Sequence, residues 1–384
     1  MYIKFNMMST YIFILGKTPD LSTAELKWRY PDAEFRFTDR EMAVIDTDVK
    51  IDSAEFNKIG GSIKCAEVVA ETEYGSIVTE LSGVLFDFYN DSKIDYGVSV
   101  YGMPEKNLRS ILLGLKKELR KNDIKSRFIN NQFRNISSAQ YKSIRKNGIE
   151  LIAAKAGNSI FIGKVTGVQD IDAYSNRDYD KPFRDMKMGM LPPKLAQIFI
   201  NLSGTDGVIW DPFCGSGTII MEGLLMGREM MGSDIKPEHI EGAKKNVEWL
   251  INSYELKAKS YELMAHDATK PVKKHFDAIV FEGDLGMPHT QLIQVEKIQG
   301  IIRYLDDLYT RFFENLKSMK CRAPIVCALP FFRLRDGRTM DLSKAIEKIE
   351  RLGFKKTELL SGKYVLKYFR EDQAVGRAVY RFTI

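Results

Sequence analysis

Short apolar runs alternate with amphipathic stretches over the first 170 residues. The runs have the length and composition of strands, and the stretches between them have the 3.6-residue period of helices. Ser22 and Glu25 have the spacing of a capping box, which predicts a helix that begins there and continues through Trp28. Strands are expected over 11–15, 41–47, 62–71, 96–102, 149–155 and 159–168, and further helices over 75–89 and 104–121. This order predicts small α+β modules.

The pattern changes after residues 170–184, a polar stretch without any period, and we place a domain boundary there. Beyond it strands and helices alternate, which predicts an α/β fold: an open, mostly parallel sheet with helices on both faces. The strands are expected over 207–211, 229–235, 260–268, 277–282 and 323–332, and the helices over 215–227, 237–252, 293–317 and 343–353. Two final strands, 354–360 and 377–384, have no helix between them, so an antiparallel terminal hairpin is expected to close the sheet.

The composition is that of an ordinary globular chain. The 384 residues are 44% hydrophobic and 28% charged, which excludes disordered, collagen-like and disulfide-dense proteins. No apolar run approaches the roughly 18 residues that a membrane helix requires, and the N-terminal pattern does not fit a signal peptide. The four cysteines have no framework spacing and the four histidines are scattered, so we expect free thiols, a cytoplasmic location and no metal site.

Positive charge is concentrated in one segment. The formal net charge is +6, yet residues 106–146 contain twelve basic and two acidic residues, so the rest of the chain is net acidic. Such a local excess is typical of a protein that binds a phosphate backbone, whereas a merely solvated helix face usually mixes both signs. We therefore predict nucleic-acid binding here, with the candidate residues Lys116, Lys117, Arg120, Lys121, Lys125 and Arg127.

A glycine-rich loop, residues 211–218 with the sequence DPFCGSGT, follows the first strand of the α/β half and leads into a helix. Ligands of open α/β sheets bind outside the carboxyl ends of the strands. Gly215 and Gly217 permit close approach of a ligand to the backbone, and the N–H groups at the helix start near Thr218 favour an anionic group. The loop therefore predicts a cofactor site, which also includes Asp211 and Phe213.

Two features favour a carboxylate over a phosphate as that anion. No Lys-Ser/Thr pair follows the second glycine as it would in a P-loop, and the loop itself contains an acid. S-adenosylmethionine, which has both an ammonium and a carboxylate group, therefore fits better than an NAD-type cofactor. Asp234 at the end of the next strand is placed to bind the ribose hydroxyls, and Asp267 after the third strand to accept from the adenine amino group.

The loop strongly resembles motif I of the amino-group methyltransferases. Nearly the whole chain is similar to the THUMP-containing tRNA guanine-N2 methyltransferases of the archaeal and eukaryotic type, through the segments 11–26, 59–71, 183–204 and 365–384. The resemblance implies a ferredoxin-like domain (1–75), a THUMP-like RNA-binding domain (76–172) and a Rossmann-like methyltransferase domain (173–384). It also implies tRNA as the partner and an exocyclic guanine amine as the methyl acceptor. A small activator subunit is a further partner that is compatible with the resemblance.

One motif departs from that family. Its members carry Asp/Asn-Pro-Pro-Tyr/Phe after the fourth strand, where this chain has the sequence EGDL at 282–285. The family's motif accepts the two amine hydrogens on a side-chain oxygen and a backbone carbonyl, and its aromatic ring stacks on the extruded base. Glu282 and Asp284 are the candidate catalytic residues, and Gly283 in place of proline is expected to aim its carbonyl less rigidly. Since Leu285 cannot stack, the candidate rings are Phe281, Phe331 and Phe332.

Three functions remain open from the sequence. The leading hypothesis is an S-adenosylmethionine-dependent enzyme that methylates the N2 amine of a guanosine in tRNA. The second hypothesis, which the altered motif suggests, is a catalytically inactive RNA-binding protein of the same fold. A DNA amino-methyltransferase is the third, because the loop motif is shared with that group, although the THUMP-like half favours RNA.

Overall fold

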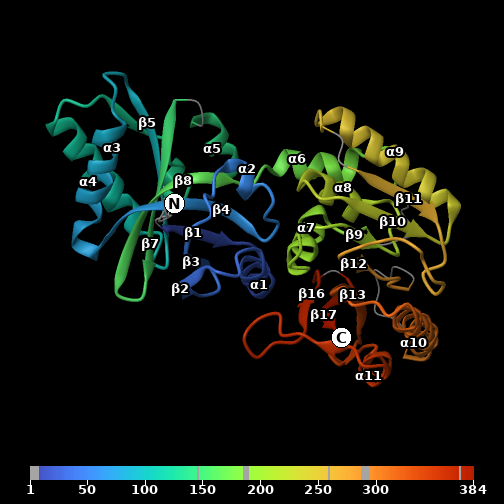
Figure 1. The fold of residues 1–384 in the computed structure, drawn as a ribbon. Helices are drawn as coiled ribbons and strands as arrows, with labels where there is room; N and C mark the ends of the chain where they lie inside the picture. Colours follow the sequence, from blue (N-terminus) through green and yellow to red (C-terminus); the bar gives the residue numbers. More distant parts are fainter. Residues whose placement is uncertain (1–7, 145–146, 185–189, 258–259, 287–294, 372) are drawn as a thin grey trace, which may run out of the picture. The chain divides into compact units, whose positions relative to one another are not determined.

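The computed structural model describes residues 8–144, 147–184, 190–257, 260–286, 295–371 and 373–384 (Figure 1). These residues form two compact units. The first comprises the chain up to Thr23 and Tyr30–Ile171, and the second comprises Ala24–Arg29 and Asp172–Ile384. The division after Ile171 falls at the start of the polar stretch 170–184. Residues 145–146 of the basic segment and 293–294 of the expected long helix lie outside the described residues.

The first unit is built on one eight-stranded sheet with the order β2-β3-β1-β4-β8-β7-β5-β6. Its strands are β1 (Ser9–Leu15), β2 (Glu34–Thr38), β3 (Met42–Thr47), β4 (Ser62–Thr72), β5 (Ile94–Tyr101), β6 (Ser126–Phe128), β7 (Gly148–Ala156) and β8 (Ser159–Val168). Its helices are α1 (Pro19–Arg29), which continues into the second unit from Ala24 on, α2 (Ser53–Phe56), α3 (Ile77–Phe88), α4 (Asn107–Lys121) and α5 (Ser138–Ile144), with 3-10 turns at Tyr74–Ser76 and Asn131–Phe133.

This sheet is continuous across the expected 75/76 border, because β4 pairs antiparallel with β8. The assignment of a ferredoxin-like part and a THUMP-like part within the unit stays a prediction. Helices α3 and α4 lie side by side over β5, β7 and β8, with which they share an apolar core (Figure 1). Leucines and isoleucines at helical spacing, from Leu108 to Leu119, form the buried stripe of α4. The opposite, cationic face of α4 is therefore left to solvent.

The second unit is built on a nine-stranded sheet whose main order is β11-β10-β9-β12-β13-β17-β15. Its strands are β9 (Ile209–Asp211), β10 (Met230–Asp234), β11 (Tyr261–Ala265), β12 (Ala278–Glu282), β13 (Ile325–Arg333), β14 (Thr339–Met340), β15 (Lys355–Lys356), β16 (Leu366–Tyr368) and β17 (Val375–Thr383). Its helices are α7 (Pro193–Leu202), α8 (Thr218–Leu225), α9 (Pro237–Ser253), α10 (Val295–Ser318) and α11 (Ser343–Arg351), preceded by α6 (Ile171–Ser175) and a π-helical turn at Asn176–Asp180.

The layers of the second unit are those of a Rossmann-like α/β fold. The five strands from β11 to β13 in the sheet order are parallel to one another. Helices α7, α8 and α9 cover one face, and α10 and α11 cover the other (Figure 1). Apolar residues of α10 and α11 pack with Trp210, Phe281 and Phe382 into one core. The expected α/β class is confirmed. Within the described residues, no helix combines the length and apolarity needed to cross a bilayer.

The terminal hairpin is only partly as expected. The last strands are antiparallel, but β17 lies between β13 and β15, and it also pairs with β16. The physical reason is the composition of β13, which is buried over eight of its nine residues and needs a partner beyond β12. The apolar strand β17 supplies that partner, and the two-residue β15 is left at the edge.

The strand order fixes where a ligand can bind. From β9 the chain proceeds to β10 and β11 on one side, whereas β12 and β13 lie on the other side. The order therefore reverses between β9 and β12, and in open α/β sheets the crevice outside the carboxyl ends of the strands at such a point is the usual ligand site. The loop 211–218 follows β9, and the EGDL motif begins at the end of β12.

Candidate functional site

The glycine loop has a backbone that its two glycines make possible. Gly215 and Gly217 have φ values of +50° and +80°, in the left-handed region that side chains rarely tolerate. Gly217 immediately precedes α8, so the free N–H groups of the helix start lie at the end of the loop. The Gly215 N–H donates to Oδ2 of Asp234 over 3.0 Å, which ties the loop to the end of β10.

The two acids nearest the loop have different surroundings. Asp211 is 2% exposed, and its Oδ1 accepts from the N–H of Phe213 over 3.1 Å. Burial raises the pKa of Asp211 well above its usual value, and the charges of Asp234 and Glu282 add to the effect. Asp234 has a side chain 12% exposed, and its Oδ1 accepts from the Lys236 N–H over 2.9 Å. Asp211 thus shapes the loop from the core, while Asp234 ties the loop to the end of β10.

Asp267 and Phe213 stand at the borders of this crevice. Oδ1 of Asp267 accepts from both the N–H and the hydroxyl of Thr269, over 2.9 and 2.7 Å. Partial burial raises the pKa of Asp267, but these hydrogen bonds outweigh it, so the pKa lies below its usual value. The Phe213 ring packs on Phe281 and Phe312, with centroids 5.1 and 5.3 Å away, and so anchors the loop in the core.

The segment ahead of α7 is held against the loop by side chains that the sequence does not single out. Asn246 of α9 accepts from the Phe183 N–H over 2.8 Å and donates to the carbonyls of Phe183 and Ser216 over 2.9 and 2.8 Å. Lys181 is 3% exposed, and its ammonium donates to the Thr218 hydroxyl over 3.0 Å. Burial lowers the pKa of Lys181. A cation thus lies at the start of α8, beside the predicted anion site.

Glu282, the first candidate catalytic residue, ends β12 and pairs with Arg377 of β17, whose Nε donates to Oε1. Both side chains are largely buried, at 12% and 6% exposure. Burial raises the pKa of Glu282 and Arg377 lowers it, with burial the larger effect. Arg377 also donates to the Met190 carbonyl over 3.4 Å. Arg377 lies 95 residues from Glu282 in the chain, and no local pattern points to the pair.

The main chain after Glu282 is held by Tyr309 of α10. A Cβ at Gly283 would lie 2.1 Å from the hydroxyl of Tyr309, so only glycine fits beside this fully buried tyrosine. The Tyr309 hydroxyl donates to the Asp284 carbonyl over 2.8 Å, and the Gly283 N–H donates to the Ala328 carbonyl over 3.1 Å. These bonds fix the main chain on either side of the Gly283 carbonyl, whose own aim stays a prediction. Asp284 itself is exposed, and its Oδ1 accepts from the Gly286 N–H over 2.8 Å.

The three candidate rings do not face the crevice. Phe281, Phe331 and Phe332 are all at most 2% exposed. Phe281 and Phe332 belong to the main core of the second unit, against which Leu285 also packs. An incoming base finds no open ring on any of the three. This expectation fails because the strand ends carrying these rings are covered by α10 and by the strands around β17.

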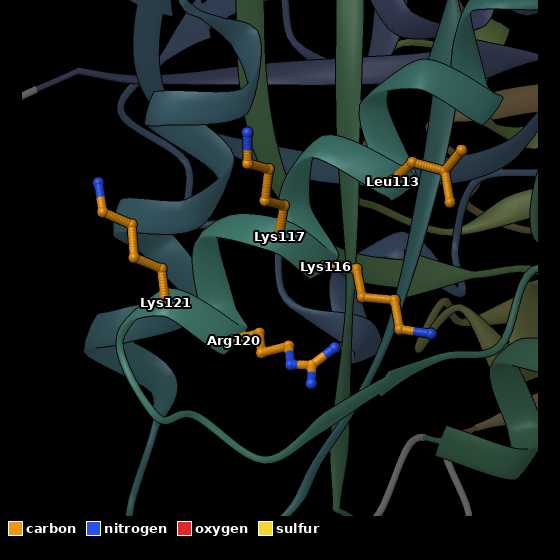
Figure 2. Close-up of a pocket in the computed structure, with 5 residues that line it drawn as sticks. All are labelled: Leu113, Lys116, Lys117, Arg120 and Lys121. Carbon is orange, nitrogen blue, oxygen red and sulfur yellow. The ribbon is translucent and has the colours of Figure 1, made fainter.

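The cationic face of α4 forms the second candidate region, in the first unit. Lys116, Lys117, Arg120 and Lys121 surround a shallow hollow of about 410 Å³ beside Leu113, and Figure 2 shows these side chains spreading away from the helix. Within the part of the chain that the structure describes, no ion pair joins these four cations to an acid. Such a surface suits a polyanion.

The last two candidate cations lie just beyond that helix and differ in their pairing. Lys125 is exposed next to β6, and its carbonyl accepts from the Ile94 N–H. Arg127 forms an ion pair with Asp95, in which Nε donates over 3.0 Å. Its charge is therefore partly neutralised, and Lys125 is the stronger candidate for a phosphate.

Comparison with known proteins gives this geometry a family context. Residues 182–282, from the lead-in segment to Glu282, match the family model UPF0020, described as RMKL-like, methyltransferase domain. The tRNA (guanine(10)-N2)-dimethyltransferase of Pyrococcus abyssi is 33% identical over 133 residues, which cover 34% of this chain and 36% of that protein. Its counterpart in Methanothermobacter thermautotrophicus is 26% identical over 191 residues, covering 46% and 52%. The matched stretches thus span about a third to a half of these relatives.

A solved structure agrees on the fold. The crystal structure of TrmN from Thermus thermophilus aligns with a TM-score of 0.51 at 13% identity, over 98% of this chain and 99% of that chain. At this identity the likeness concerns the fold alone. The methyltransferase resemblance of the sequence is confirmed for residues 182–282, and the matched relatives are named as tRNA guanine-N2 methyltransferases.

Proposed function

We propose that this chain is an S-adenosylmethionine-dependent RNA methyltransferase that modifies the N2 amine of a guanosine in tRNA. The observation that carries the proposal is the DPFCGSGT loop at the point where the strand order reverses, tied to Asp234 through Gly215. The names of the matched relatives, tRNA (guanine(10)-N2)-dimethyltransferases, supply the substrate class. A cytoplasmic location accords with tRNA as the substrate, and the small activator subunit stays a prediction.

The residues around the crevice fit this cofactor. When bound, S-adenosylmethionine supplies an electrophilic methyl group on its sulfonium. The start of α8 and the Lys181 ammonium beside Thr218 suit the carboxylate of the cofactor, since both are positive. Asp234 keeps lone pairs beyond the backbone hydrogen bonds that it accepts, which suits ribose hydroxyls. Asp267 is assigned to the adenine amino group.

On the acceptor side we assign the amine-binding oxygen to Glu282, with Asp284 as the second candidate. An exocyclic amine is a poor nucleophile because its lone pair is delocalised into the ring, and acceptors for its hydrogens localise that pair. With the cofactor bound, this nitrogen would form the N–CH₃ bond as the C–S bond breaks, and the electron pair of that bond would stay on sulfur. The nitrogen loses one proton, for which a carboxylate with a raised pKa is a good acceptor. The hydrogen bonds that fix Gly283 and Asp284 hold the geometry that in-line transfer requires.

The test measures transfer of labelled methyl groups to unmodified tRNA. Wild type is compared with Glu282→Gln and Asp284→Asn, and Glu241→Gln serves as a control, because Glu241 is an exposed acid paired with Lys244. We expect Glu282→Gln to reduce the rate about 100-fold, since small errors in positioning have effects of that size, and Glu241→Gln to leave it unchanged. Full activity in both Glu282→Gln and Asp284→Asn would remove the assigned acceptor site.

Two further measurements separate the rival functions. Calorimetric titration with S-adenosylhomocysteine asks whether the crevice binds the cofactor at all. Binding of tRNA without methyl product and without cofactor binding identifies the inactive RNA-binding protein. Competition by duplex DNA for the methyl transfer identifies the DNA amino-methyltransferase.

A further inference from the structure

A short segment ahead of the last strand interleaves cations with aromatic rings. Residues 363–370, with the sequence KYVLKYFR, contain three cations, three aromatic residues and no acid. The segment is anchored on β17, where the buried Leu366 pairs with Val379. Tyr364 and Phe369 are 49% and 48% exposed, and Phe369 is the most exposed phenylalanine among the residues that the structure describes. Such a combination needs an explanation, since an exposed ring gains nothing from water.

The Phe369 ring is held in place. It packs edge-to-face on the buried Phe331, with centroids 6.3 Å apart and planes at 81°. The guanidinium carbon of Arg333 lies 5.1 Å from the Phe369 centroid, and Arg333 is itself held because it donates to the Glu371 carbonyl over 3.3 Å. The Lys367 ammonium lies 4.9 Å from the Phe331 centroid. The half-exposed Phe369 ring is thus held by Phe331 and Arg333, and Lys367 lies against the neighbouring Phe331 ring.

This cluster adjoins the acceptor residue. Tyr368 lies opposite Arg377 in the β16–β17 pairing, and the Arg377 guanidinium carbon is 5.8 Å from the Tyr368 centroid. The same guanidinium binds the Glu282 carboxylate. Contacts therefore run from the assigned amine-binding oxygen through Arg377 to Tyr368, and Phe369 is the next residue in the chain.

We propose that Phe369, flanked by Arg333 and Lys367, is a stacking site for an unpaired nucleobase of RNA that lies next to the methylated guanosine. The inference rests on the proposed function and deepens it. Every base has a π-face that an exposed ring can cover, and neighbouring cations meet the phosphates on either side of it. The site thus suits an unpaired, single-stranded segment rather than a duplex, in which the faces of the bases are covered.

The test measures the equilibrium affinity for unmodified tRNA, with near-identical thermal unfolding as the criterion for an intact fold. We expect Phe369→Ala and Phe369→Leu to weaken binding about 5- to 100-fold, because stacking on one base has that value, and Phe369→Trp to retain it. Tyr304→Ala is the matched control, since Tyr304 is a 55% exposed aromatic residue of α10 in the same unit. Leucine keeps the apolar volume without the ring, so it separates stacking from simple burial.

The salt dependence of tRNA binding distinguishes the contribution of the Phe369 ring from that of the neighbouring cations. Arg333→Gln is expected to reduce the slope of log affinity against log salt concentration by about one, as loss of one phosphate contact does. Phe369→Ala is expected to leave that slope unchanged, because a ring releases no counterions.

The outcomes distinguish this inference from the proposed function. Wild-type affinity in Phe369→Ala and Phe369→Leu, or an equal loss in Tyr304→Ala, overturns the stacking site and leaves the methyltransferase proposal intact. A loss confined to the Phe369 variants in a chain that transfers no methyl groups supports the stacking site and overturns the enzyme. Failure of the wild type to bind tRNA overturns both.

Discussion

A buried ion pair beneath the glycine loop gives the sharpest stability prediction. Nε and Nη2 of Arg177 donate to the two carboxylate oxygens of Glu222 in α8, over 2.6 and 3.1 Å. Their side chains are 6% and 0% exposed. Burial alone would lower the pKa of Arg177, but the Glu222 carboxylate outweighs it and holds the pKa above its usual value. Gln197 also donates to Glu222, over 2.9 Å, so the carboxylate accepts at least three hydrogen bonds.

The substitution Glu222→Gln keeps the volume and removes the charge. The buried guanidinium then faces an amide that cannot neutralise it, and breaking a buried pair in this way costs about 3–5 kcal/mol. For a unit of this size that corresponds to a fall in Tm of about 6 to 20 °C. Glu241→Gln breaks an exposed pair with Lys244, which contributes little to stability because solvent screens it.

Tryptophan fluorescence is a suitable signal, because the chain's three tryptophans, Trp28, Trp210 and Trp249, all belong to the second unit. The double variant Arg177→Met/Glu222→Leu should regain at least half of the loss, since an apolar pair of similar volume leaves no unpaired charge. Equal Tm changes in Glu222→Gln and Glu241→Gln, or no recovery in the double variant, would refute this reasoning.

Two further predictions concern the loop itself. Gly217→Ala should destabilise the second unit by about 1–2 kcal/mol and weaken S-adenosylhomocysteine binding, because φ is +80° and the new Cβ would lie 3.1 Å from Cβ of Ala243. As a control, Gly300→Ala should stabilise α10 by about 0.5–1 kcal/mol, because a Cβ there meets nothing within 4 Å. Urea unfolding measures the stability of both variants, and calorimetry measures their binding. Asp211→Asn should stabilise the chain at neutral pH, because a neutral amide avoids the cost of burying a charge. Burial raises the pKa of Asp211 in the folded state above its unfolded value, so the folded state binds more protons and the wild type loses stability as the pH rises above about 4. Urea unfolding between pH 4 and 8 measures the difference, which should vanish at the acid end; a constant difference over this range would contradict it.

The sequence by itself determined the parts of this protein that depend on neighbours in the chain. The alternation of strands and helices indicated the α/β class, and the DPFCGSGT loop with Asp234 indicated the cofactor crevice, because a strand, a turn and a helix start are local structures with local signals. The cationic stripe on α4 followed in the same way from helical spacing.

Only the tertiary structure decided which distant residues complete the site. Arg377 lies 95 residues beyond Glu282, and Tyr309 lies 25 residues beyond the Asp284 carbonyl that it holds. Only the fold shows why residue 283 is glycine, because it places the Tyr309 hydroxyl where a side chain would lie. Periodicity reports which face a side chain lies on, but not which partner the packing of other elements brings to it, because that partner is chosen by the whole core at once.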